Sequence, residues 1–209
     1  MEIEAKYIVP DPAFARKLRA LERVNGFSLS TPTRLRVRDT FFDTRMNDLL
    51  QVRYVLRIRQ RSDGKRFITL KQPTIRQDAI HRRPETEQEL HIQKTPRVLH
   101  LSELPPRIKK LVAPIARSDS LVPLFSISQT RQIRMLRQGR AVIAEWSLDH
   151  VRFRAGRRTR AFYELEIELK NKGTEKDLAK LTAWLEQEYQ LQPAVESKFA
   201  RALEFTRGT

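Results

Sequence analysis

The chain has 209 residues, and its 41 lysines and arginines against 25 aspartates and glutamates give a formal net charge of +16. This excess of base favours polyanionic partners such as nucleic acid, acidic lipid or phosphate compounds, without choosing among them. The absence of cysteine excludes disulfides, a thiolate nucleophile and cysteine-bound zinc. No apolar run approaches the ~20 residues of a membrane span, and the acidic start is unlike a signal peptide. We therefore expect a cytoplasmic protein with one domain, residues 1–209.

The first predicted elements are a strand and a helix. Residues 2–9 alternate charged and apolar positions, which is the pattern of a strand with two different faces. A helix follows at Pro12, where Asp11 can serve as the N-cap and an apolar stripe recurs at helical spacing. Residues 33–44 predict the next strand.

A hairpin is predicted in the following segment. Residues 52–61 and 66–72 alternate as strands, and Ser62-Asp63-Gly64 between them is typical of a turn. Residues 82–93 predict another strand, with an edge position or an irregular start at Pro84 because proline cannot donate to a ladder.

The C-terminal half predicts broken helical pieces over 101–118 and a second hairpin turning at Gln138-Gly139. A last strand over 161–170 precedes a helix capped by Thr174, with an acid at the capping-box position, and a short helix closes the chain. Most strands are joined by short turns, so the sheet should be mainly antiparallel.

The charged faces of these strands are sorted by sign. Arg57 and Arg59 share one face of their strand, whereas Glu164, Glu166 and Glu168 share one face of theirs. An ordinary sheet with one solvated face explains any single strand, but aligned glutamates repel one another, and the apolar helix stripes need the apolar strand faces to cover. A curved sheet with its charged faces inside satisfies both requirements, because acids then face bases and the apolar faces remain outside for the helices.

The predicted fold is therefore α+β, an eight-stranded antiparallel β-barrel, or tunnel, with a charged interior and helices packed outside. A barrel of about eight strands has room for one small ligand. Carboxylates suit hard divalent cations such as Mg²⁺ or Mn²⁺, and arginine and lysine suit phosphate. Such an interior indicates a container for a metal-bound polyphosphate.

A series of segments, in order, resembles the CYTH, or triphosphate tunnel metalloenzyme, superfamily, which includes class IV adenylate cyclases, thiamine triphosphatases and inorganic triphosphatases. The likeness covers residues 1–205. The matching segments are Glu2-x-Glu4-x-Lys6, Thr40-Phe-Phe-Asp-Thr44, Leu56-Arg57-Ile58-Arg59, Thr69-Leu70-Lys71, Arg83-Pro-Glu85-Thr-Glu87, Arg131, Ser147-Leu-Asp149, Glu164-Leu-Glu166-Ile-Glu168 and Ser197-Lys198.

The resemblance implies a role for each matching charge. An acidic wall for one or two Mg²⁺ or Mn²⁺ ions would consist of Glu2, Glu4, Glu164, Glu166 and Glu168. The substrate-binding and catalytic bases, which would hold the phosphates, are Lys6, Arg57, Arg59, Lys71, Arg83, Arg131 and Lys198. The residues that would orient these bases or hold a second ion are Glu85, Glu87 and Asp149. Water would be the nucleophile, since phosphoryl transfer needs positioning and charge stabilisation more than covalent chemistry.

The resulting hypothesis is a metal-dependent triphosphatase, most simply of inorganic tripolyphosphate. A class IV-type adenylate cyclase or a thiamine triphosphatase on the same fold is the alternative. A hypothesis of another class is a non-catalytic module that binds polyphosphate or RNA, because a basic run lies outside the tunnel set at Arg152, Arg154, Arg157, Arg158 and Arg160. The expected partner is a small-molecule triphosphate, and no membrane is expected to be a partner. The net charge is also compatible with nucleic acid, which the hypothesis does not require. Other bases are expected on the solvated surface: Arg53, Arg61, Lys65 and Lys94.

Overall fold

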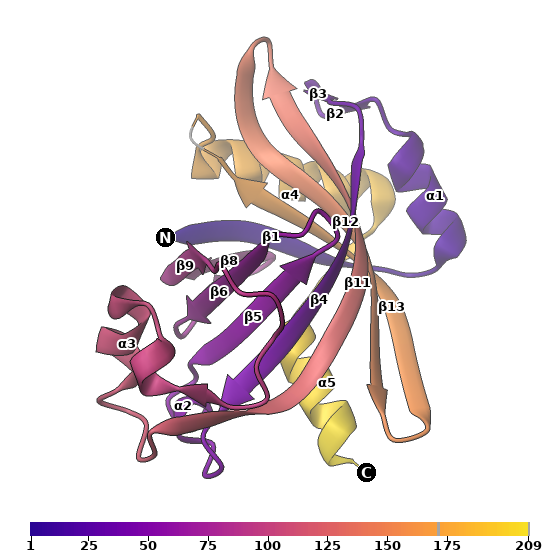
Figure 1. Cartoon of the computed structure of the whole chain (residues 1–209). Helices are drawn as coiled ribbons and strands as arrows, with labels where there is room; N and C mark the ends of the chain where they lie inside the picture. Colours follow the sequence, from indigo (N-terminus) through magenta and orange to yellow (C-terminus); the bar gives the residue numbers. More distant parts are fainter. Residues whose placement is uncertain (171, 209) are drawn as a thin grey trace.

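One strongly curved antiparallel sheet organises the structure, a computed structural model that describes residues 1–170 and 172–208 (Figure 1). The N-terminal strands are β1 (Glu2–Val9), β2 (Arg23–Val24), β3 (Phe27–Leu29), β4 (Thr33–Asp43), β5 (Val55–Arg61), β6 (Arg66–Lys71) and β7 (Ile75–Gln77). The later strands are β8 (Ile80–Arg83), β9 (Glu85–Glu89), β10 (Leu99–His100), β11 (Ser120–Gln138), β12 (Ala141–Ala155), β13 (Arg158–Leu169) and β14 (Gln192–Pro193). The helices are α1 (Pro12–Ala20), α2 (Asp48–Gln51), the 3-10 turn η1 (Leu101–Glu103), α3 (Pro106–Val112), α4 (Glu175–Tyr189) and α5 (Lys198–Arg207).

The predicted α+β class and antiparallel pairing are confirmed, but the closed eight-stranded barrel is wrong. Among the described residues the sheet has 14 strands, and its main path runs β7-β8-β1-β13-β12-β11-β4-β5-β6-β9 without closing. The cause lies at Pro84, which divides the strand predicted over 82–93 into β8 and β9. Arg83 pairs with Glu2 of β1, whereas Glu85 pairs with Lys71 of β6. The two borders of the curved sheet are therefore joined by the covalent chain rather than by a hydrogen-bonded ladder.

Two long hairpins form the back of the sheet. β11 and β12 meet at the predicted turn, where Gly139 has a φ of 58°, a conformation that glycine adopts without steric cost. β12 and β13 meet at Gly156, with a φ of 57°, so the basic run over 152–160 is the tip of a hairpin.

Helices cover parts of the convex face. α1 and α4 lie over one apolar cluster that includes Trp146 and Leu181, and α3 lies over another that includes Ile58 and Ile108. The capping box predicted for α4 is present, since the Asp177 amide donates to Thr174 Oγ1 at 3.2 Å and the Thr174 amide donates to Asp177 Oδ2 at 3.0 Å. These local signals position α4 where its leucines meet the sheet.

The last helix departs from the prediction that helices pack outside. α5 contacts β11 and β12 on the concave side, where Phe199 packs 5.1 Å from Phe41 between ring centroids. Its N-cap, Ser197, and its first two residues, Lys198 and Phe199, line the cavity inside the sheet. In Figure 1 the yellow α5 lies across the lower part of the sheet. Across the described ranges, none of the helices has the length and apolar character needed to span a membrane.

Candidate functional site

A cavity of about 270 Å³ lies inside the curved sheet. Among the described residues, nine basic and eight acidic side chains line it, so its charges nearly balance. Thirteen predicted site residues are brought together there: Glu2, Glu4, Lys6, Arg57, Arg59, Lys71, Arg83, Glu85, Glu87, Arg131, Glu166, Glu168 and Lys198. Charged lining residues that were not assigned to the site from the sequence are Asp39, Arg61, Glu145 and Lys170.

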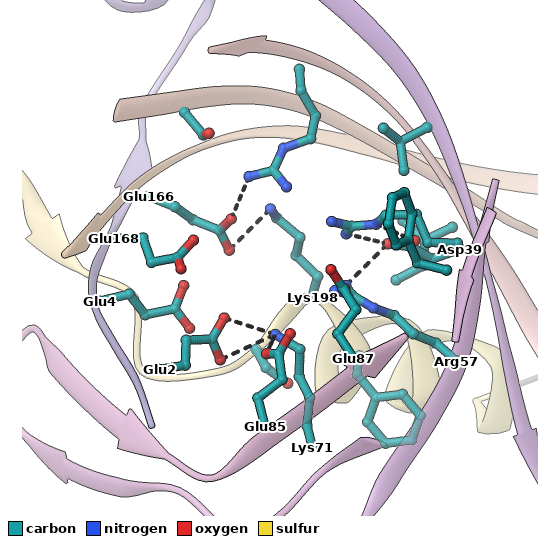
Figure 2. A pocket seen from close by; sticks show the side chains of 18 of the residues that line it. Glu2, Glu4, Asp39, Arg57, Lys71, Glu85, Glu87, Glu166, Glu168 and Lys198 are labelled. Carbon is teal, nitrogen blue, oxygen red and sulfur yellow. Dashed lines mark hydrogen bonds and ion pairs between the residues drawn. The ribbon is translucent and has the colours of Figure 1, made fainter. Parts of the chain in front are cut away.

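An acidic column runs along one side of the cavity. Glu4 of β1 pairs with Glu168 of β13, and Glu168 pairs in turn with Glu145 of β12, so three acids form one row across neighbouring strands. Figure 2 shows Glu166, Glu168, Glu4 and Glu2 in sequence down this side. The strands' alternation puts these carboxylates on the concave face while the intervening apolar residues pack beneath the helices.

The acids of this column are neutralised by bases of the same cavity. Lys71 Nζ lies 2.9 Å from Glu2 Oε1, and Arg83 Nε lies 2.5 Å from Glu2 Oε2. Lys6 Nζ bridges Glu4 and Glu166, at 3.1 Å from each. Burial of these charges without partners would be prohibitive, so the interior is stabilised by its own ion pairs.

The opposite side carries two arginines fixed by a buried aspartate. Arg59 forms a two-point contact with Asp39, Nε to Oδ1 at 2.7 Å and Nη2 to Oδ2 at 2.8 Å, and Arg57 approaches at 3.4 Å. Burial would raise the pKa of Asp39, but Arg59 and Arg57 hold it well below its usual range. Among the described residues, Arg57 Nε is buried and has no hydrogen-bond partner, so Asp39 is the acceptor that holds this guanidinium.

Asp39 is the residue that the sequence analysis missed most completely. It is 2% exposed and also accepts a hydrogen bond from Gln129 at 3.0 Å. Its signal in the sequence is slight: Asp39 lies on a strand face with the apolar residues Leu35, Val37 and Phe41. An acid on an apolar strand face needs a buried cation, and that was the available clue.

At the deep end, Asp149 holds two bases. It is fully buried, accepts from Arg131 Nε at 2.9 Å and accepts a short hydrogen bond from Lys198 Nζ. Arg131 Nη2 and Lys198 Nζ both reach Glu166, at 2.9 and 3.1 Å. Asp149 does not line the cavity itself, and its contacts are those of a positioning residue beneath Arg131 and Lys198.

Glu164 is placed differently from the other predicted metal ligands. It shares the concave face of β13, but it is fully buried behind α5 and does not line the cavity. Its nearest cations are Lys198 at 3.4 Å and Arg201 at 3.9 Å. Burial, with repulsion from Glu166, raises the pKa of Glu164 to about 7 despite Lys198. Glu164 therefore lies behind the cavity wall rather than on it, and its role as a metal ligand stays a prediction.

The remaining predicted residues differ in the contacts that the structure gives them. Glu85 forms an ion pair with Lys71 at 2.7 Å, whereas Glu87 accepts from the Thr69 hydroxyl at 2.8 Å and contacts no base in the described part of the chain. Arg61 was expected on the solvated surface, and this is only partly right, because its guanidinium pairs with Asp63 at the turn, at 2.6 Å, while the residue also lines the cavity. It is half-buried at the cavity wall, with its guanidinium 5.6 Å from the centroid of the Phe67 ring.

The family model described as CYTH domain matches residues 1–203. The chain belongs to the CYTH domain family. No curated protein matches this chain.

Solved structures agree in fold with this CYTH chain. A putative adenylyl cyclase from Hippeastrum has a TM-score of 0.74 at 22% identity, with 98% of this chain and 96% of that chain covered. A putative adenylate cyclase from Bacillus halodurans has a TM-score of 0.63 at 22% identity, with 96% of each chain covered. The PH1819 protein from Pyrococcus horikoshii OT3 has a TM-score of 0.60 at 19% identity, with 98% and 99% covered. At these identities the likeness shows the fold alone.

The CYTH cavity suits a divalent cation by its donor chemistry. The row Glu4, Glu168 and Glu145 supplies only carboxylate oxygens, the donors that Mg²⁺ and Mn²⁺ prefer. Burial raises the pKa of Glu168 against the attraction of Lys170, and the carboxylates of Glu145 and Glu2 raise it further, so a cation here would relieve repulsion. As the side chains stand, no group of three acids or histidines within residues 1–170 and 172–208 converges on one point, because the column is turned toward its bases.

Proposed function

We propose that this CYTH-domain protein is a divalent-metal-dependent triphosphatase, with inorganic tripolyphosphate as its simplest substrate. The observation that carries the proposal is that one cavity holds both a carboxylate column on β1, β12 and β13 and a larger set of bases, most of them on β5, β6, β8, β11 and α5 (Figure 2). The column supplies metal ligands and the bases supply phosphate ligands, which together match a metal–triphosphate complex.

Binding of a triphosphate in this cavity requires the basic side chains to exchange carboxylate partners for phosphate oxygens. Lys71 and Arg83 are held by Glu2, and Lys6 is held by Glu4 and Glu166. A triphosphate offers these cations phosphate oxygens in place of carboxylates, and the carboxylates thereby become free. A divalent cation held by Glu4, Glu168 and Glu145 would neutralise phosphate charge and supply an activated water.

The other bases are fixed before substrate arrives. Asp39 fixes Arg57 and Arg59, and Asp149 fixes Arg131 and Lys198. Donors that are already oriented toward developing charge stabilise a transition state without reorganisation at the moment of reaction. No nucleophilic side chain is required for transfer to water.

The lining of the cavity favours a substrate that carries no nucleobase or other aromatic ring. Its aromatic rings are Phe41, Phe67 and Phe199. Phe41 and Phe199 pack against each other in a tilted arrangement beside Phe125, and Arg61 lies over Phe67. No ring pair among the lining residues is therefore free to sandwich adenine or thiamine. The solved Hippeastrum protein, a putative adenylyl cyclase, is described as having a dominant triphosphatase activity, which supports hydrolysis over cyclisation on this fold.

The test is a substrate panel of tripolyphosphate, ATP and thiamine triphosphate, each with Mg²⁺, Mn²⁺ or a chelator. We expect phosphate release from tripolyphosphate that the chelator stops and metal restores. Glu4→Gln should lower the rate by about 10²-fold, the scale of one lost charge-stabilising group, whereas the exposed Glu188→Gln should not. Cyclic AMP from ATP as the main product would favour the cyclase. Absence of phosphate release from every triphosphate by metal-loaded protein would overturn the proposal.

A further inference from the structure

A second, open cavity of about 600 Å³ is lined by residues of the same strands and shares only Val37 and Arg61 with the tunnel. Arg36 and Arg38 of β4 alternate with Val37 and Asp39, which line the tunnel, so the two arginines point to the convex side. The outer basic surface is defined by Arg36, Arg38, Ser128, Thr130, His150 and Arg152.

The outer basic surface has a regular layout. Arg38 pairs with Ser128 and Ser128 with Arg152, which makes one row across β4, β11 and β12. The adjacent row consists of Arg36, Thr130 and His150. Strands lie ~4.8 Å apart and alternate residues ~7 Å apart, so the guanidiniums are set at intervals of roughly 7–10 Å with hydroxyls between them.

These arginines have no acidic partner, in contrast to the bases of the tunnel. Arg36, Arg38 and Arg152 are exposed, and none of them forms an ion pair with any described residue. The tunnel lining carries nine bases and eight acids, whereas the whole chain has a net charge of +16. Nearly all the excess positive charge therefore lies outside the tunnel, where it is available to an external polyanion.

An aromatic pair lies at the edge of the outer basic surface. The rings of His150 and Tyr163 are stacked at 4.6 Å between centroids and 21° between planes, and Arg19 lies 5.6 Å from the Tyr163 centroid. Burial and the nearby Arg152 and Arg19 lower the pKa of His150, so its ring is neutral at pH 7. A neutral stacked ring beside unpaired guanidiniums is what a nucleobase and its phosphates require.

We propose that the outer basic surface binds single-stranded nucleic acid, with Arg36, Arg38 and Arg152 on phosphates and the His150–Tyr163 pair against a base. Inorganic polyphosphate fits less well, because it has no base to stack and its neighbouring phosphates share an oxygen, far closer together than the guanidiniums. None of the six residues that define this surface lines the tunnel, so the proposal does not depend on the triphosphatase activity.

The test measures anisotropy of a labelled single-stranded oligonucleotide, with chelator present and over a range of salt. Arg38→Gln combined with Arg152→Gln should weaken binding about tenfold and flatten the slope of log K against log salt by about 1.4, for two lost phosphate contacts. The matched control combines Arg97→Gln with Arg107→Gln, two exposed arginines elsewhere that give the same change in net charge. The control should retain both affinity and slope.

His150→Ala distinguishes the ligand class. It should weaken the oligonucleotide about 5-fold or more without changing the salt slope, because it removes stacking and no charge. Neither set of substitutions should alter hydrolysis in the tunnel, which confirms that the variants fold. Equal losses in the control pair would overturn the site, since attraction would then be general. Unchanged binding by His150→Ala, with polyphosphate displacing the oligonucleotide, would overturn the assignment to nucleic acid.

Discussion

Asp149→Asn tests whether the bases of the tunnel must be fixed in advance. Asp149 is fully buried and accepts hydrogen bonds from Arg131 and Lys198, which face the cavity while Asp149 does not. Asparagine keeps the shape and one acceptor but removes the negative charge. Both cations should then lose their fixed position, and two positive charges remain buried with one fewer partner.

The expected magnitudes follow from these contacts. Removing one member of a buried ion pair costs about 3–5 kcal/mol of unfolding free energy, and the amide oxygen that remains argues for the lower end. A displacement of two phosphate-binding groups by about 1 Å should lower kcat/KM about 10²-fold, which corresponds to ~2.7 kcal/mol of transition-state stabilisation. The assays are urea unfolding and phosphate release from tripolyphosphate with Mg²⁺ or Mn²⁺.

The control is Glu175→Gln, which breaks the exposed pair with Arg82 and should change stability by less than ~1 kcal/mol. Wild-type kcat/KM in Asp149→Asn, together with a loss of stability no larger than that of the control, would refute the argument that these bases need a buried anion.

Three further outcomes test the fold. Asp39→Asn should cost about 3–5 kcal/mol at neutral pH. Because Arg59 and Arg57 lower the folded-state pKa of this carboxyl, its contribution is complete above its unfolded pKa of about 4 and is lost as the pH falls through the folded value. The difference from wild type in urea unfolding should therefore be flat between about pH 5 and 8 and shrink in acid; a difference that widens in acid contradicts the pairing. Leu181→Ala, at a fully buried position of α4, should cost about 2–5 kcal/mol by chemical denaturation, against less than ~0.5 kcal/mol for Ile75→Ala at an exposed site. Thr174→Ala should cost about 1 kcal/mol by removing the α4 cap, and no measurable change would show that the cap is redundant.

The predictable part of the fold is the part coded by short-range patterns. The alternation in β1 and β13 fixes which face carries Glu4 and Glu166, since a strand cannot change its two-residue period. The cap at Thr174 and the turn at Gly139 are likewise set by a few adjacent residues. The prediction that these charged faces meet in one cavity followed from the helices, whose apolar stripes need the apolar strand faces to cover.

The unpredicted part depends on contacts between distant segments. Burial of Glu164 is imposed by α5, some thirty positions later, whose Lys198 and Arg201 close over it. The importance of Asp39 depends on its two arginine partners across the β4–β5 ladder, and the sequence of β4 alone does not identify them. The barrel does not close because β8 and β9, the two halves of the predicted strand, pair with different strands, β1 and β6. Pro84 indicates a break in the strand but does not identify these partners.

The seam at Pro84 would connect the proposed binding of phosphate to the circumference of the tunnel. β1 and β6 face each other across it, and Lys71 of β6 reaches over to Glu2 of β1 at 2.9 Å. A phosphate that draws Lys71 away from Glu2 also releases that cross-link between the two borders. Within the described residues no ladder joins β8 to β9, so a change in the circumference of the curved sheet would have to occur at this seam rather than within a ladder.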